Sequence, residues 1–271
     1  MLVILAGTAH AQTGLPEPGI LPDSAFYGLK KAFEAVGGAF TFGNEARVER
    51  GLKLSEKRLA EAKAMAEKGR PDIVNSLSLE YEKHLGYANR IAGLAKEANE
   101  RERLTELVSL ATSQHLGILD DVQAKVPDIA KNTIAAAREK SIKGNQEALK
   151  ALARENPEKA AQIAIDAAES RVSEAMEAAN SRKYEEAIAS SAEYEKYARF
   201  GEEISAIAQQ MGKDSSKAEE LIEKATSHHM TVLEDVRAKV PEEAKPYISM
   251  VIEQTQEGRE SAVGSRILPR R

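Results

Sequence analysis

The feature that most constrains the fold is a seventeen-residue segment that occurs twice. Residues 111–127 read ATSQHLGILDDVQAKVP and residues 225–241 read ATSHHMTVLEDVRAKVP, with eleven identical positions. Other matches keep an offset of 113 residues as far as Ile91, which matches Ile204, and of 114 residues from Ala111 onward. A unit of about a hundred residues is large enough to be a domain. The sequence therefore predicts a tandem duplication of one unit.

The spacing of apolar residues decides the fold class. Through most of the chain they recur every three or four positions, which places them on one face of a helix. The chain is 42% hydrophobic but only 4% aromatic, and it has no Trp. Cores of this composition are seams of Ala, Leu and Ile between close-packed helices. The predicted fold class is all-α, a tandem duplication of a bundle of long antiparallel helices, preceded by an aromatic-rich N-terminal helix.

The first eleven residues, MLVILAGTAHA, contain an apolar run that ends in Ala9-His10-Ala11. Small residues such as Ala9 and Ala11, separated by one residue and followed by the cleavage point before Gln12, are typical of a signal-peptidase site. The expected basic segment before the apolar run is missing and the run is short. We interpret residues 1–11 as a truncated signal peptide, with the absence of any signal as the alternative. The signal peptide predicts an extracytoplasmic protein, secreted or at the cell surface, whose mature chain begins at Gln12. No later stretch has the roughly twenty apolar residues of a membrane span, so any attachment to the envelope would be peripheral.

The remaining boundaries follow from prolines, glycines and capping residues. The predicted segments are a linker (12–22), an N-terminal helix that packs on repeat 1 (23–43), repeat 1 (44–145), a helical connector (146–161), repeat 2 (162–263) and a basic tail (264–271). Asp23 or Ser24 is the expected N-cap of the N-terminal helix. The last helix of repeat 1 is expected to open at Pro127 and end near Gly144, and Asn156 is expected to cap the helix that leads into repeat 2.

The N-terminal helix carries an aromatic face. Its members are spaced by three and four residues: Phe26, Leu29, Phe33, Val36 and Phe40. We expect this face to pack on the helical bundle, because a large apolar patch left in water favours aggregation. The alternative is a docking helix for a membrane or a protein partner.

Composition excludes several classes of function. The chain has no Cys, which excludes disulfides, zinc–thiolate sites and a thiolate nucleophile. A net charge of −5, with acidic and basic residues interspersed, argues against a nucleic-acid partner. No cofactor is expected. A protein partner or self-association is expected instead, because small residues would let helices approach closely within a bundle or between subunits. These small residues are Ala88, Gly93, Ala111, Gly117, Gly201 and Ala225.

The best candidates for a functional site are His115 and His229, which occupy equivalent positions in the two copies. A metal site on one helix would place a second ligand three or four residues further on. Those positions are apolar in both copies: Ile118 and Leu119, Val232 and Leu233. Each histidine is therefore interpreted as a seam residue that bonds to a neighbouring helix, with metal binding or proton sensing as the alternative. Tyr81 and Tyr194 are predicted to be core rings whose hydroxyls reach the edge of the bundle.

Two other groups of polar residues carry less information. His84 lies four residues after Glu80, as a ligand pair would, but Tyr197 replaces it in the second copy. The acidic pairs Asp120-Asp121 and Glu234-Asp235 occur in both copies. Adjacent residues on a helix point about 100° apart, so neither pair forms a catalytic dyad. We expect them to be solvated or paired with basic residues of a neighbouring helix.

The N-terminal part of the chain contains a longer motif. It reads PGILPDS from Pro18 to Ser24, then YGLK from Tyr27 to Lys30, and a later helix holds RLAE from Arg58 to Glu61. These segments, with HLGILDDVQAKVPDIAK further on, resemble an uncharacterised family catalogued as domain of unknown function 5667, in exported archaeal and bacterial proteins. Through the duplication the resemblance extends over most of the chain. It implies an exported helical protein and transfers no catalytic residue.

No motif dictates a reaction. The sequence has no Gly-rich phosphate loop after a predicted strand and no Gly-x-Ser-x-Gly elbow. The leading hypothesis is an exported, non-catalytic helical scaffold or interaction module at the cell surface. The second is an extracytoplasmic sensor that binds a metal or small ligand between helices near His115 and His229. The third is a hydrolase whose site is assembled from separate helices.

Overall fold

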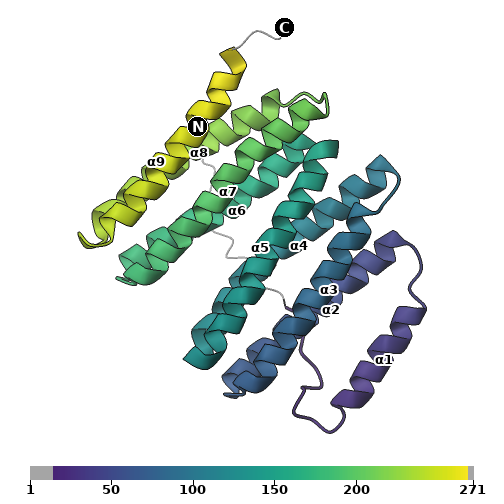
Figure 1. Ribbon diagram of the computed structural model, residues 1–271. Helices are drawn as coiled ribbons and strands as arrows, with labels where there is room; N and C mark the ends of the chain where they lie inside the picture. The colour runs from purple at the N-terminus through teal and green to yellow at the C-terminus, as the bar shows by residue number, and fades with distance from the viewer. Residues whose placement is uncertain (1–14, 268–271) are drawn as a thin grey trace, which may run out of the picture. The chain divides into compact units, whose positions relative to one another are not determined.

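The structure is a computed structural model that describes residues 15–267. In this part of the chain the protein is helical (Figure 1). Its elements are α1 (Tyr27–Ala39), α2 (Asn44–Glu67), α3 (Pro71–Gly93), α4 (Ala98–Lys125), α5 (Asp128–Glu155), α6 (Pro157–Asn180), α7 (Tyr184–Gln210), α8 (Ser216–Lys239) and α9 (Lys245–Ile267). For residues 202 and 258–267 only the backbone is described. The predicted all-α fold is confirmed. The expected signal peptide at residues 1–11 and the expected mature start at Gln12 lie outside the described residues.

Each copy of the repeat supplies four helices, α2 to α5 from the first and α6 to α9 from the second. One predicted boundary was wrong. Helix α5 does not end near Gly144 but continues to Glu155. The residues after Gly144 are good helix formers, and Leu149 and Leu152 among them are fully buried, so packing favours continuing the helix. Residues predicted to form a separate connector are thus divided between α5 and α6.

The break between α5 and α6 is where the sequence predicts it. The side chain of Asn156 accepts a hydrogen bond from the backbone N–H of Lys159 at 3.1 Å, and Pro157 occupies the first turn of α6. This is the usual N-cap arrangement, in which a side-chain oxygen satisfies an amide that has no partner within the helix.

The helices form two compact units. Among the described residues, the first unit holds those up to Ile91 together with Ala111–Gly144, and the second holds Ala92–Leu110 together with those from Asn145 onward. Helices α4 and α5 therefore contribute to both units. The compact units do not coincide with the sequence repeats, because packing groups halves of these two long helices with different neighbours.

The first unit has the predicted core of aliphatic seams. Its fully buried residues include Val48, Leu59 and Met65 of α2, Val74 and Ala88 of α3, Leu119 and Val122 of α4, and Ile134 and Ala137 of α5. The predicted core ring Tyr81 is also fully buried. Helices α2 and α3 approach closely, because a Cβ atom on Gly51 would lie 2.9 Å from the Cβ of Ala88 and 3.2 Å from the carbonyl oxygen of His84.

The second unit is built from more alanine. Helix α6 packs on α7 and α8, and α9 packs on α7 and α8. One of its core clusters contains Leu149, Leu152 and Ala153 of α5, Ala160, Ala161, Ile163 and Ala164 of α6, Phe200 and Ile204 of α7, and Ala218 of α8. Gly201 lets α7 approach α8 closely, because a Cβ atom at this position would lie 3.0 Å from Cγ2 of Ile222. At Gly93 and Gly117, in contrast, a Cβ atom would meet nothing within 4 Å.

Helix α1 corrects the main expectation for the N-terminal region. Its aromatic face was expected to pack on the bundle, but Phe26, Phe33 and Phe40 are 66%, 69% and 73% exposed. Leu29 and Val36 on the same face are also exposed, and the buried residue of α1 is Lys30. The expected N-cap, Asp23 or Ser24, was also wrong. Helix α1 starts at Tyr27, and no side chain caps it. The helix does lie on repeat 1, but through its polar side.

Within residues 15–267, no helix combines the length and the hydrophobicity that crossing a membrane requires.

Candidate functional site

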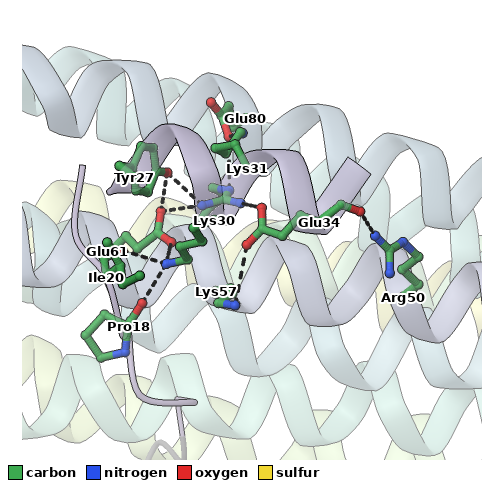
Figure 2. Close-up of polar contacts among 11 residues, drawn as sticks. Pro18, Ile20, Tyr27, Lys30, Lys31, Glu34, Arg50, Lys57, Glu61 and Glu80 are labelled. Atoms are coloured by element: carbon green, nitrogen blue, oxygen red, sulfur yellow. Dashed lines mark hydrogen bonds and ion pairs between the residues drawn. The ribbon is translucent and has the colours of Figure 1, made fainter. Parts of the chain in front are cut away.

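The polar side of α1 is centred on the ammonium group of Lys30. It donates hydrogen bonds to the backbone carbonyls of Pro18 at 2.7 Å and Ile20 at 2.8 Å, and it forms an ion pair with Glu61 of α2 (Figure 2). An ammonium has three protons, so these three acceptors satisfy all of them. A buried lysine is therefore fully compensated, which is the condition for keeping a charge inside a protein.

The Glu61 carboxylate, whose side chain is fully buried, is shared by three donors from two helices. It pairs with Lys30 and with Arg58 of its own helix, and it accepts a hydrogen bond from the Tyr27 hydroxyl at 2.7 Å. Burial and this hydrogen bond raise the pKa of the Tyr27 hydroxyl, which keeps it a donor. Burial acts to lower the pKa of Arg58, but the charge and hydrogen bond of Glu61, together with Tyr27 and Glu34, outweigh burial, so the pKa of Arg58 is raised.

A second ring of charges surrounds this centre. Glu34 of α1 pairs with Arg58 and, at 3.4 Å, with Lys57, while Lys31 pairs with Glu80 of α3 (Figure 2). Every charged residue of α1 is thus directed at α2 or α3. Carboxylates from three helices do converge here, as a hydrolase site would require, but each is engaged by lysine or arginine. We call Tyr27, Lys30, Lys31, Glu34, Arg58, Glu61 and Glu80 the N-terminal polar cluster.

The polar cluster explains the motif that carries the family resemblance. Gly19 has a φ of +65°, a left-handed conformation that suits glycine, and the carbonyls on either side of it both reach Lys30. Asp23 pairs with Lys68 at 2.7 Å. Tyr27 and Lys30 of the first motif meet Arg58 and Glu61 of the second. The motif residues therefore attach the N-terminal segment and α1 to α2.

The outward side of α1 has the opposite character. Its exposed positions within the helix are all Gly, Ala, Val, Leu or Phe, and Phe42 just after the helix is 75% exposed. A surface helix normally buries its apolar stripe and exposes its charges. Here the attachment of the charges to α2 and α3 leaves the apolar side outward. Contiguous apolar patches of this kind mark interaction sites on soluble proteins.

The two candidate histidines occupy buried seams. In the first unit, Nδ1 of His115 lies 3.3 Å from the Tyr81 hydroxyl, which donates a hydrogen bond to Ser141 at 3.0 Å. Nε2 of His115 lies 4.0 Å from a carboxylate oxygen of Glu56. Each of these four residues comes from a different helix, α2 to α5. The prediction that His115 bonds to a neighbouring helix is confirmed.

The second unit repeats this arrangement at the offsets of the duplication. Nε2 of His229 lies 2.6 Å from a carboxylate oxygen of Glu169, and its ring meets Tyr194 edge to face, with centroids 5.3 Å apart. Thr255 of α9 takes the position of Ser141 and opposes the effect of burial on the pKa of Tyr194, which is raised. Tyr194, like Tyr81, is fully buried, so both rings lie in the core as predicted, but their hydroxyls do not reach the edge of the bundle. His229 also lines a small cavity with Tyr197 and Thr226.

Other predicted polar groups have ordinary structural partners. Asp120 pairs with Arg138 of α5 at 2.6 Å and Asp121 with Lys63 of α2 at 2.9 Å, as expected for ion pairs with neighbouring helices. Burial lowers the pKa of His84. In the described part of the chain, no three His, Cys, Asp or Glu side chains are grouped as metal ligands would be. Metal binding at His115 or His229 stays a prediction.

The pKa of His229 leads to a testable pH dependence. Burial lowers this pKa, and the hydrogen bond to Glu169 only partly opposes the effect. Below a pH of about 6.5 the unfolded chain therefore binds a proton that the folded chain does not, and stability falls as pH decreases toward the lowered pKa. We expect the midpoint of thermal unfolding to drop by a few degrees more between pH 7.5 and 5.5 in the natural chain than in His229→Gln.

The exposed neighbour His228 provides the matched control. His228→Gln should keep most of the pH dependence of the natural chain, because that side chain is exposed and its charge is the smallest influence on the pKa of His229. Equal pH dependence in His229→Gln and the natural chain would show that His229 does not titrate differently on unfolding.

Comparison with known proteins shows a resemblance to one family and a similar fold. No curated protein matches the chain. A solved chain titled "Computational Design of Self-Assembling Cyclic Protein Homooligomers" matches 86% of this chain and 91% of its own length, at 15% identity and a TM-score of 0.60, which supports the helical fold alone. Residues 19–129 match the family described as Domain of unknown function (DUF5667). The resemblance to this family is therefore confirmed over the stretch that contains α1 and its polar cluster.

Proposed function

We propose that this protein is an exported, non-catalytic helical scaffold or interaction module at the cell surface. The observation that carries the proposal is the outward apolar side of α1, which is held in place by a buried polar cluster. Burying lysine and arginine is costly unless they are fully paired. A chain that buries these charges while leaving four phenylalanines in water has arranged α1 for contact with something outside the unit.

The helical repeat fits a scaffold. Long helices joined by short connections give a rigid support, and sites on rigid elements hold their geometry better than sites on loops. The designed protein of similar fold assembles into cyclic homooligomers, so this kind of helical array is compatible with self-association. Export is supported by the small-x-small pattern that ends at Ala11.

Two measurements on intact cells test this function. We expect an external protease to degrade the protein without lysis, and N-terminal sequencing to find Gln12. A photo-crosslinking amino acid at Phe33 should give a discrete crosslinked species, whereas the same group at Ile129, which is 79% exposed, should not. A protein that is protected until lysis would refute the surface location. Equal crosslinking at both positions would refute a specific contact through α1.

The alternative function is an extracytoplasmic sensor for a metal or small ligand near His115 and His229. The observation in its favour is the repeated group of Tyr, His and Glu, together with the cavity beside His229. The thermal measurements proposed for His229, repeated with zinc, nickel or calcium, separate the two functions. A rise in the unfolding midpoint that His115→Ala or His229→Ala abolishes would support the sensor.

A further inference from the structure

The exposed side of α1 contains two parallel stripes of different size. The bulky stripe consists of Phe26, Leu29, Phe33, Val36 and Phe40. The small stripe consists of Ala25, Gly28, Ala32, Ala35 and Ala39. All ten residues of the two stripes are exposed. Both stripes have the spacing of three and four residues that lines up side chains along a helix. The first residues of each lie in the turn just before α1.

The two stripes are complementary to one another. At about 100° per residue, the bulky stripe covers about 80° of the helix surface, and the small stripe is centred about 100° to one side. The alternation of three and four is the pattern by which two helices pack along a seam. When two copies of α1 are related by a two-fold axis, the bulky stripe of each can lie over the small stripe of the other. A two-fold interface requires such self-complementarity.

The exposed area is large enough for a dimer. A phenylalanine side chain has on the order of 200 Å² of surface. Phe26, Phe33 and Phe40 are 66–73% exposed, so together they expose on the order of 400 Å². Two copies would bury about 800 Å² through these rings, and the contributions of Leu29 and Val36 bring the total near the lower range of specific interfaces, about 1,200 Å².

The charges near α1 favour a protein surface over a lipid surface. Helices that bind membranes present Lys and Arg beside their apolar face, where they meet anionic headgroups. Both lysines of α1 are instead paired with carboxylates, Lys30 with Glu61 and Lys31 with Glu80. The chain carries a net charge of −5, which an anionic membrane surface would repel.

From these observations we infer that the outward side of α1 is the interface between two copies of this chain, which pair through α1 about a two-fold axis. The inference rests on the proposed interaction role of α1 and names its partner. The polar cluster then has a defined part in assembly. It fixes α1 before the copies meet, so that pairing does not have to order a thirteen-residue helix.

The oligomeric state of the full chain tests this inference. Light scattering at micromolar concentration is expected to show a dimer. Phe33→Glu places a charge in the centre of the bulky stripe and should weaken dimerisation by more than about tenfold. Ile129→Glu is the matched control, because Ile129 is 79% exposed and lies on α5, and this variant should remain dimeric. Circular dichroism establishes that both variants keep their helices.

Crosslinking gives a second readout that does not depend on affinity. The chain has no cysteine, so Ala32→Cys in the small stripe provides a single thiol. Mild oxidation should convert this variant to a covalent dimer, whereas Ile129→Cys should stay monomeric under denaturing conditions. Absence of the Ala32→Cys dimer, or equal dimer yields from both variants, would overturn the inference.

The other occupants of this surface give different results. A monomer that binds vesicles of phosphatidylcholine and phosphatidylglycerol through Phe33 would overturn the inference and assign the surface to lipid. A chain that dimerises only after residues 1–11 are removed would support the inference, because the mature chain is proposed to begin at Gln12. In the lipid case the proposed interaction function survives while pairing of copies does not, so the two failures are distinguishable.

Discussion

Glu61→Ala is expected to reduce the free energy of unfolding by about 3–5 kcal/mol. The substitution removes the carboxylate that is shared by Lys30, Arg58 and the Tyr27 hydroxyl. Both cations would keep their other contacts but lose the central negative charge in a buried site, and an uncompensated buried charge is far more costly than a missing surface ion pair. Denaturation in urea, followed by circular dichroism, measures the loss.

The duplication supplies a matched control for this prediction. Glu174 takes the position of Glu61 in the second copy and pairs with Arg171 at 2.7 Å, but its side chain is 36% exposed. Ion pairs at that degree of exposure contribute about 0–1 kcal/mol, so Glu174→Ala should have a small effect. Equal losses in the two variants would contradict the central role assigned to Glu61.

A local measurement separates detachment of α1 from global destabilisation. In Glu61→Ala, amide hydrogens of α1 should exchange faster, because the helix loses the central contact of its attachment and is too short to be stable alone. The amide hydrogens of α5, which contributes no residue to the polar cluster, should change their exchange rate only as much as the change in global stability requires. Unchanged exchange in α1 would show that other contacts hold the helix.

The sequence predicts the architecture well because periodicity and duplication report on the cores. Val48, Leu59 and Tyr81 are buried where spacing places them, and the Asn156 cap is correct. The side of α1 that packs could not be predicted in the same way. Periodicity identifies an amphipathic helix but not which side faces the protein, and the usual rule that the apolar side is buried fails here because the charged side finds complete partners.

The polar cluster was also missed, although its residues were quoted in the motif. Tyr27 and Lys30 lie about thirty residues before Arg58 and Glu61, and nothing in their spacing shows that they meet. One signal was present in the sequence. Lys30, Lys31 and Glu34 are the charged residues of α1, and α2 and α3 offer opposite charges in Arg58, Glu61 and Glu80. For the histidines, spacing along one helix can predict only partners on that helix, whereas Tyr81 and Glu56 come from other helices.

The close approach of α2 and α3 gives the second large effect. Gly51→Val would place a Cβ atom 2.9 Å from the Cβ of Ala88 and 3.2 Å from the backbone of His84, so the two helices would have to separate. Overpacking of a helix contact costs about 1–3 kcal/mol. Gly86→Val on α3 is the control, because a Cβ atom there meets nothing within 4 Å. It should be neutral or slightly stabilising, since valine is a better helix former than glycine.

The second copy suggests how this clash can be relieved. At the offset of 113 residues, Ala164 replaces Gly51 and Gly201 replaces Ala88, so the glycine has changed helices. Gly51→Ala alone should destabilise the first unit, and Ala88→Gly alone should cost about 1 kcal/mol of helix propensity. In the double variant, removal of the Ala88 methyl group makes room for the new one, so the combined loss should be smaller than the sum. A double-mutant cycle by urea denaturation measures this coupling. Strictly additive losses would show that the two positions do not share the space between α2 and α3.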